Sequence, residues 1–152
     1  MKATAVAPAN IAFIKYWGKK DEALRLPLNS SISMNLSEAY TMTTVEFSSG
    51  YAADYVEGAF ARQEVERMSA HLDRIRLRAG KALYARVTTK NSFPKGAGIA
   101  SSASGFAALT VAACAALGLK LSEKELSVLA RLGSGSACRS IPDGFTMWEE
   151  GD

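Results

Sequence analysis

Apolar and polar residues alternate in several stretches of the chain, and this alternation predicts β-strands. The longest stretch, Ser31–Glu46, predicts two strands joined near Glu38 and Ala39, and it contains many of the β-branched and aromatic residues that strands favour. Residues 10–16 alternate less regularly and predict a strand or an irregular segment that leads to a turn at Gly18. Shorter strands are predicted over residues 3–7, 51–56, 83–89 and 144–149.

Three helices are predicted, each by a different signal. Residues 63–79 place apolar side chains three and four positions apart, and Gly80 follows as a stop signal. An alanine-rich run in the second half of the chain predicts a helix that ends at Gly118. A capping box over residues 122–125 opens a third helix that reaches Leu132.

The composition is that of an ordinary globular protein. The 152 residues are 48% hydrophobic and 22% charged, which predicts one domain with a sizeable core. A net charge of +3 is too small to indicate a nucleic-acid partner, although it is compatible with anionic substrates. Two cysteines, Cys114 and Cys138, form no disulfide framework, and the first residues lack a signal-peptide pattern, so a cytoplasmic location is expected. His71, the single histidine, is interpreted as a structural or surface residue rather than a catalytic one.

Residues 91–117 contain the main candidate for chemistry. A glycine-rich turn that carries Lys95 runs directly into Ser101 and Ser102, where the alanine-rich helix begins. Glycines let a ligand approach the main chain, and the first turn of a helix offers unpaired N–H groups. Together with the lysine and the hydroxyls, these groups predict a phosphate-binding site. The alternative is an ordinary capped loop before a buried helix.

The same stretch also invites a membrane interpretation. No charged residue occurs between Lys95 and Lys120, and this span is long enough to cross a bilayer. It consists mostly of Ala, Gly and Ser, however, so its insertion into lipid is unfavourable. The pattern therefore predicts a helix buried within protein, and no membrane contact is expected.

Two other stretches carry groups that suit an anion. Residues 15–20 hold three lysines and two aromatic residues, and residues 133–140 read G-S-G-S-A-C-R-S. The alternative for the first stretch is a solvated cationic edge with an aromatic anchor. The alternative for the second is a flexible loop.

Taken together, the three motifs resemble those of the diphosphomevalonate decarboxylases, a branch of the GHMP kinase superfamily. Residues 94–103 match the superfamily pattern P-x-x-x-G-[LI]-x-S-S-A. A-P-A-N-I-A-x-x-K-Y-W-G-K at residues 7–19, with L-P-L-N-S-S-I-S at residues 26–33, is similar to the N-terminal signature of the decarboxylases. The string at residues 133–140 matches theirs throughout, and the resemblance extends over residues 7–150.

The resemblance implies roles for individual residues. Lys15 and Arg139 are the implied catalytic residues, with Lys15 close to the reacting hydroxyl and Arg139 paired with the substrate carboxylate. The implied substrate-binding residues are Tyr16, Trp17, Gly18, Lys19, Arg67, Ser134, Gly135, Ser136, Ala137, Cys138 and Arg139. The implied ATP-binding residues are Asn91, Lys95, Gly96, Ala97, Gly98, Ser101 and Ser102. The resemblance assigns no metal ligand to the protein itself, and Mg²⁺ is expected to bridge the ATP phosphates.

The resemblance also implies an α+β fold, the ribosomal protein S5 domain 2-like N-terminal domain of GHMP kinases. Residues 1–152 are expected to form this ATP- and substrate-binding domain, with the C-terminal ferredoxin-like domain absent. In the family, an aspartate beside the reacting 3-hydroxyl lies in that other half. The 152 residues alone are therefore expected to be inactive.

The implied activity is the ATP-dependent decarboxylation of mevalonate 5-diphosphate to isopentenyl diphosphate through phosphorylation of the 3-hydroxyl. The full-length enzyme is expected to be a cytoplasmic homodimer. Two alternatives stay open: a decarboxylase of mevalonate 5-monophosphate, and a non-catalytic anion-binding fragment.

Overall fold

The computed structural model describes residues 1–15, 18–94 and 101–151. Its strands are β1 Lys2–Ile14, β2 Lys19–Asp21, β3 Leu26–Pro27, β4 Ser31–Ser48, β5 Tyr55–Glu57, β6 Tyr84–Asn91 and β7 Phe145–Trp148. Its helices are α1 Arg62–Ala79, α2 Ser101–Ala116, α3 Glu123–Gly133 and the short 3₁₀ helix η1 Gly135–Ser140. Five strands form one sheet in the order β1-β4-β6-β5, with β7 paired to β4, while β2 and β3 form a separate hairpin.

The long strand β4 organises the sheet. It pairs antiparallel with β1 along one side, and along the other side it pairs with β7 near its beginning and with β6 near its end. Strand β5 adds parallel to β6, and α1 connects these two strands along the chain. The sheet is therefore mixed, and it is mostly antiparallel.

The structure corrects two sequence predictions about strands. β4 is one continuous strand, whereas two strands were predicted there. β1 is also continuous, whereas a strand over residues 3–7 followed by a separate strand or irregular segment over residues 10–16 was predicted. The register shows why: Pro8 pairs with Tyr40 but Ala9 pairs with Leu36, so residues 37–39 of β4 bulge. The bulge accommodates the irregular positions without a turn, and Pro8 is tolerated because β1 lies at the edge of the sheet.

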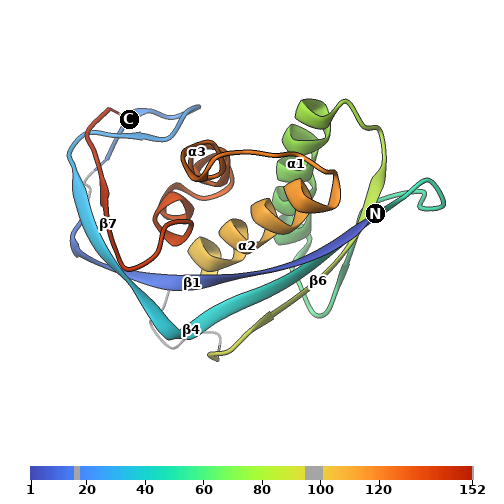
Figure 1. Ribbon diagram of the computed structural model, residues 1–152, viewed down its shortest axis with the longest axis horizontal. Coiled ribbons are helices and arrows are strands. Elements are labelled where there is room, and N and C mark those ends of the chain that lie inside the picture. The colour runs from blue at the N-terminus through green and yellow to red at the C-terminus, as the bar shows by residue number, and fades with distance from the viewer. Residues whose placement is uncertain (16–17, 95–100, 152) are drawn as a thin grey trace.

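The helices gather on one face of the sheet, with α2 against β1 and β4 and with α1 and α3 beside it (Figure 1). Alanines on both sides make this close approach possible. Ala5, Ala7 and Ala9 are the buried side chains of β1, and Ala107 and Ala112 are fully buried in α2. The alanine-rich run is thus a helix buried in protein, as predicted, and small side chains on both elements let helix and sheet pack tightly.

A buried ion pair fixes α1 against the sheet. The Asp54 carboxylate accepts hydrogen bonds from Arg76 Nη1 and Nη2 at 2.8 Å each, from the Ala85 N–H and from Ser69 Oγ. Burial alone would raise the pKa of Asp54, but the hydrogen bonds from Arg76, Ser69 and Ala85 outweigh it and hold that pKa below its ordinary value. Because the ion pair at Arg76 fixes the position of α1, it also fixes where the earlier residues of this helix lie relative to α2.

The predicted helix boundaries are confirmed. Gly80 follows α1 with φ of 63°, and Gly118 follows α2 with φ of 71°, a backbone region that favours glycine. Ser122 Oγ accepts from the Glu125 N–H while Glu125 Oε2 accepts from the Ser122 N–H, so the predicted capping box begins α3.

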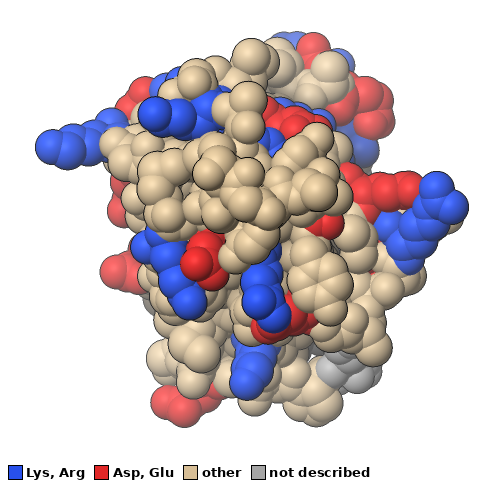
Figure 2. Space-filling model, turned by 90° about the vertical axis from the view of Figure 1, so that its right-hand side faces the viewer, with Lys and Arg blue, Asp and Glu red and all other residues tan. Residues whose placement is uncertain are grey.

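Acidic and basic side chains are interspersed on the face that carries the N-terminus and one end of the sheet, without a large patch of one sign (Figure 2). The excess positive charge that gives the chain its net charge of +3 is therefore not concentrated on this face. Within the described ranges, no helix combines the length and apolar character needed to cross a membrane.

Candidate active site

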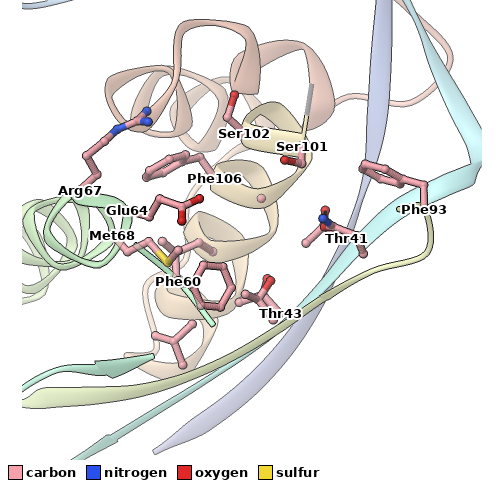
Figure 3. A pocket seen from close by; sticks show the side chains of 15 residues that line it. Thr41, Thr43, Phe60, Glu64, Arg67, Met68, Phe93, Ser101, Ser102 and Phe106 are labelled. Carbon is pink, nitrogen blue, oxygen red and sulfur yellow. Dashed lines mark hydrogen bonds between the residues drawn. The ribbon is translucent and has the colours of Figure 1, made fainter. Parts of the chain in front are cut away.

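A cavity of about 360 Å³ lies between α1, α2 and the inner face of the sheet (Figure 3). Four predicted site residues share it: Arg67 from α1, Asn91 at the end of β6, and Ser101 and Ser102 at the start of α2. The complete lining is Thr41, Thr43, Phe60, Glu64, Arg67, Met68, Val87, Thr89, Asn91, Phe93, Ser101, Ser102, Gly105, Phe106 and Leu109. One end thus offers hydroxyls and a guanidinium, and the remainder is largely apolar.

The polar end of the cavity is formed by Ser101 and Ser102, the first residues of α2 that the structure describes. The N-terminus of a helix carries N–H groups without partners within the helix and is the positive end of the helix dipole. Hydroxyls close to such a terminus suit phosphate oxygens.

Asn91 is oriented by its neighbours in the sheet and in α2. Thr41 Oγ1 donates to Asn91 Oδ1 at 2.7 Å, and the same threonine is hydrogen-bonded to Ser104 Oγ at 2.7 Å. With its carbonyl oxygen engaged, Asn91 keeps its amide N–H groups to donate to a ligand. Neither Thr41 nor Ser104 was among the residues predicted for the site. Thr41 is buried on the inner face of β4, and nothing in the alternating pattern of the sequence indicated that this residue positions another.

The motif at residues 133–140 lies against the same cavity. It is the end of α3 followed by η1, not the flexible loop of the alternative interpretation. Ser134 Oγ donates to Ser102 Oγ at 3.4 Å, and Arg67 Nη2 donates to the Gly133 carbonyl at 3.3 Å. The guanidinium of Arg67 also lies 5.2 Å from the centre of the Phe106 ring. The structure therefore brings Ser102 of α2, Arg67 of α1 and the third motif together at one place.

Arg139 is buried and held by the first two long strands. Its Nη1 donates to Ser31 Oγ at 2.9 Å, and its Nε lies 3.4 Å from Asn10 Oδ1. Asn10 Nδ2 in turn donates to Ser140 Oγ at 2.7 Å and to the Ser136 carbonyl at 3.2 Å. Asn10 thus connects β1 to η1, a role that its place inside the A-P-A-N string did not reveal.

The other predicted residues of η1 do not line the cavity. Ala137 is fully buried in the core, and Gly135 is buried as well. The Cys138 thiol donates to the Gly135 carbonyl at 3.2 Å and faces a second cleft, and burial raises the pKa of this thiol to about 11. These three residues shape η1, and Cys138 stays a protonated thiol at neutral pH.

Lys15, Gly18 and Lys19 lie at the connection between β1 and the β2–β3 hairpin. Gly18 takes φ of 83°, which the predicted turn requires, and Lys15 and Lys19 are exposed. Asn29 Nδ2 donates to the Lys15 carbonyl at 3.1 Å, and Lys19 Nζ forms an ion pair with Glu22 at 2.8 Å. These residues therefore lie outside the cavity lining.

Six predicted site residues fall outside the described residues: Tyr16, Trp17, Lys95, Gly96, Ala97 and Gly98. His71, by contrast, is described and is fully buried. Its Nε2 is 2.8 Å from Thr110 Oγ1, and its ring meets Phe106 edge-on. The interpretation of His71 as structural is therefore consistent with its position.

Comparison with known proteins agrees with this arrangement. The model of a family described as "Diphosphomevalonate decarboxylase-like N-terminal domain" matches residues 7–152. The chain belongs to this family. Among curated relatives, the diphosphomevalonate decarboxylase of Candida albicans is 42% identical, with 98% of this chain and 45% of the fungal protein covered. The human diphosphomevalonate decarboxylase is 40% identical, with 98% and 41% covered.

Solved structures of this family superpose on the whole chain. The mevalonate diphosphate decarboxylase from Enterococcus faecalis is 46% identical with a TM-score of 0.93, and the match covers 100% of this chain and 48% of that one. The enzyme from Staphylococcus aureus is 48% identical with a TM-score of 0.90, covering 100% and 47%. A structure named MDDEF in complex with MVAPP, AMPPCP and magnesium is 46% identical with a TM-score of 0.92, covering 100% and 47%.

The chain therefore spans slightly less than half the length of the relatives it matches, and it corresponds to their N-terminal domain. The predicted α+β class and the predicted family are confirmed. In the described part of the chain, no three His, Cys, Asp or Glu side chains gather into a metal site.

Proposed function

We propose that this chain supplies the N-terminal, nucleotide- and substrate-binding part of an enzyme that decarboxylates mevalonate 5-diphosphate with ATP. The 3-hydroxyl is phosphorylated, the phosphate leaves, CO2 is lost, and isopentenyl diphosphate, ADP and inorganic phosphate are the products. The proposal rests on the cavity, which is lined by Arg67, Ser101 and Ser102. Ser134 adjoins it through its hydrogen bond to Ser102. Phosphoryl transfer is catalysed mainly by positioning and charge neutralisation, and these are the groups that provide both.

ATP is assigned to the cavity. The hydroxyls of Ser101 and Ser102 and the start of α2 hold its phosphates, together with Lys95 and residues 96–98 of the glycine-rich turn. Asn91 donates to the nucleotide through its amide. The apolar remainder of the cavity, with Phe60, Met68 and Leu109, suits a planar base. Mg²⁺ bound together with ATP would supply further neutralisation of the phosphate charge.

The substrate is assigned to the groups around η1 and the β1–β2 connection. Arg67 binds the 5-diphosphate, because a guanidinium pairs with two phosphate oxygens at once, and Tyr16, Trp17, Gly18 and Lys19 complete this contact. The hydroxyls of Ser134 and Ser136, with residues 135, 137 and 138 shaping η1, hold the rest of the molecule.

Two charged residues carry the chemistry in this proposal. Arg139 pairs with the substrate carboxylate, and its hydrogen bonds to Ser31 and Asn10 hold it in one orientation. Lys15 lies close to the 3-hydroxyl and stabilises the negative charge of the transferred phosphate. The aspartate beside that hydroxyl comes from the other half of the enzyme, so this chain alone binds its ligands without turnover.

The diphosphate is favoured over the monophosphate because the relatives above are named for it. Arg67 and Lys19, the groups assigned to the terminal phosphates, support the same choice. The full-length enzyme is assigned a homodimeric state and a cytoplasmic location. The two free, buried cysteines fit a reducing compartment.

The proposal is tested by ligand binding to Arg67→Ala. Mevalonate 5-diphosphate binding, measured by calorimetry, should weaken by about ten-fold or more, because a charge-assisted hydrogen-bonding group is lost. Arg62→Ala is the matched control, since Arg62 lies on the same helix, is exposed and pairs only with Glu66 among the described residues. Equal affinities of wild type and Arg67→Ala would contradict the assigned role.

A paired assay for ADP and CO2 then separates the candidate functions. It supplies ATP, Mg²⁺ and either mevalonate 5-diphosphate or the monophosphate. Binding of the diphosphate without ADP or CO2 is the expected result for this chain. Products from the monophosphate would favour the alternative substrate, and products from the diphosphate would show that a group in this chain replaces the family's aspartate.

A further inference from the structure

A second cleft, of about 270 Å³, lies between α3, η1 and β7. Its walls include Arg131 and Ser127 of α3, Cys138 and Arg139 of η1, and Thr146 and Trp148 of β7. None of the groups assigned to ATP lines this cleft, so it is distinct from the cavity between α1 and α2.

Two polar groups in this cleft are buried and have no partner among the residues that the structure describes. Arg131 is 7% exposed, and its Nε finds no hydrogen-bond acceptor in the described part of the chain. Thr146 Oγ1, from β7, is likewise buried and has no hydrogen-bond partner among the described residues. Nor does any described Asp or Glu form an ion pair with Arg131.

A buried guanidinium without an anion is unusual, because removing its charge from water costs free energy that a partner normally offsets. Arg131 lies in the last turn of α3, where the helix dipole favours a cation. The dipole, however, supplies no acceptor for Nε. The missing element is therefore a planar, hydrogen-bond-accepting anion.

Charged side chains of both signs also line the cleft. Glu123, Lys124 and Glu149 are exposed, and Arg139 is buried. Lys124 and Arg139 therefore balance the two carboxylates. The shape of the guanidinium selects the anion, because its planar fork matches the two oxygens of a carboxylate.

We propose that this cleft binds a small carboxylate, held by the guanidinium of Arg131 and the hydroxyl of Thr146. Arg131 donates from Nε and a terminal nitrogen to the two carboxylate oxygens, and Thr146 donates to one of them. Because Cys138 and Arg139 form the adjoining wall, a carboxylate at this position fastens η1 to α3 and β7.

The test uses acetate as the probe, with the midpoint of thermal unfolding as the measurement. Acetate should raise the midpoint above that in chloride at equal ionic strength and pH, because a ligand that binds only the folded state stabilises it. Acetamide, which has the same shape without the charge, should raise it less. Equal midpoints in acetate and chloride would overturn the proposal.

Variants locate the effect. Thr146→Val is nearly isosteric and removes a hydroxyl without a described partner, so it should fold and bind acetate roughly five-fold more weakly. Arg131→Met should abolish the acetate effect, whereas Arg62→Met, an exposed change on α1, should retain it. An unchanged acetate effect in Thr146→Val would refute the site even if Arg131→Met failed to fold.

The NMR signal of the Arg131 Nε–H group distinguishes a free carboxylate from one supplied by a polypeptide segment. Acetate should shift this signal and slow its exchange with solvent. An Nε–H signal that neither shifts nor changes its exchange rate when acetate is added would show that no free carboxylate reaches Arg131, and the proposal would fail.

Discussion

At the scale of single residues, His71 makes the folded protein sensitive to acid. Burial lowers the pKa of His71 from 6.5 to about 3, with Arg74 and Arg25 adding repulsion. Thr110 Oγ1 donates to the Phe106 carbonyl and so accepts from His71 Nε2, which leaves Nδ1 without a proton. The unfolded chain therefore binds a proton below pH 6.5 that the folded chain does not bind.

The free energy of unfolding therefore keeps its full contribution from the neutral His71 above pH 6.5 and decreases as the pH falls toward 3. Between pH 7 and 5.5 the loss is about 1 kcal/mol, from a limiting slope of about 1.4 kcal/mol per pH unit. Urea unfolding of wild type and His71→Leu at both pH values measures it. The variant should lose about 1 kcal/mol less than wild type, and parallel losses would contradict the assignment.

At the scale of elements, the packing of α3 on α2 depends on Gly133. A Cβ at this position would lie 2.3 Å from Phe106 Cδ1, a contact that forces the ring or the helix to move. Phe106 is already fixed by the Arg67 guanidinium and the His71 ring. The first glycine of the G-S-G-S string therefore permits the third motif to reach the cavity.

Gly133→Ala should accordingly destabilise the protein by about 1–3 kcal/mol, the usual cost of overpacking, and weaken AMPPCP binding in the cavity. Gly105→Ala is the matched control for stability. A Cβ there meets nothing within 4 Å, and alanine is favoured over glycine in a helix by up to about 1 kcal/mol. The two variants should shift the urea midpoint in opposite directions, and a Gly133→Ala protein as stable as wild type would rule out the overpacking.

Elements with a local signal were predictable from the sequence. The capping box at Ser122, the stop at Gly80 and the apolar period of α1 all appear where they were predicted. The bulge at residues 37–39 was not predictable, because it is set by pairing with β1, and nothing local distinguishes it from a turn. The short β2–β3 hairpin was missed for the same reason, since its strands are held by each other rather than by a pattern.

The candidate site shows the same division. Ser101 and Ser102 were found because glycine, hydroxyl and helix signals coincide in the sequence. Met68 has the same helical period as Leu72, yet Met68 borders the cavity while Leu72 is fully buried. Periodicity reports which face turns inward, and it does not report whether that face meets another side chain or an open space.

At the scale of the whole molecule, one end of the sheet exposes a cluster of apolar side chains on the face away from the helices. Phe145 is 72% exposed and stacks on Phe13 with ring centres 6.3 Å apart. Ile14, Ile32 and Met147 lie beside them in register across β1, β4 and β7, and each is exposed. Clustered apolar surface of this kind favours association, because contact between two copies removes it from water.

The protein should therefore show a mass that rises with concentration in light scattering at neutral pH. Phe145→Ser combined with Phe13→Ser should lower the apparent mass toward that of the monomer, with little effect on folding because both rings are mostly exposed. Leu77→Ser provides the comparison: Leu77 is 85% exposed on α1, so its replacement removes as apolar a side chain without touching the cluster. A monomeric mass for wild type at every concentration, or an equal effect of Leu77→Ser, would show that this face does not drive association.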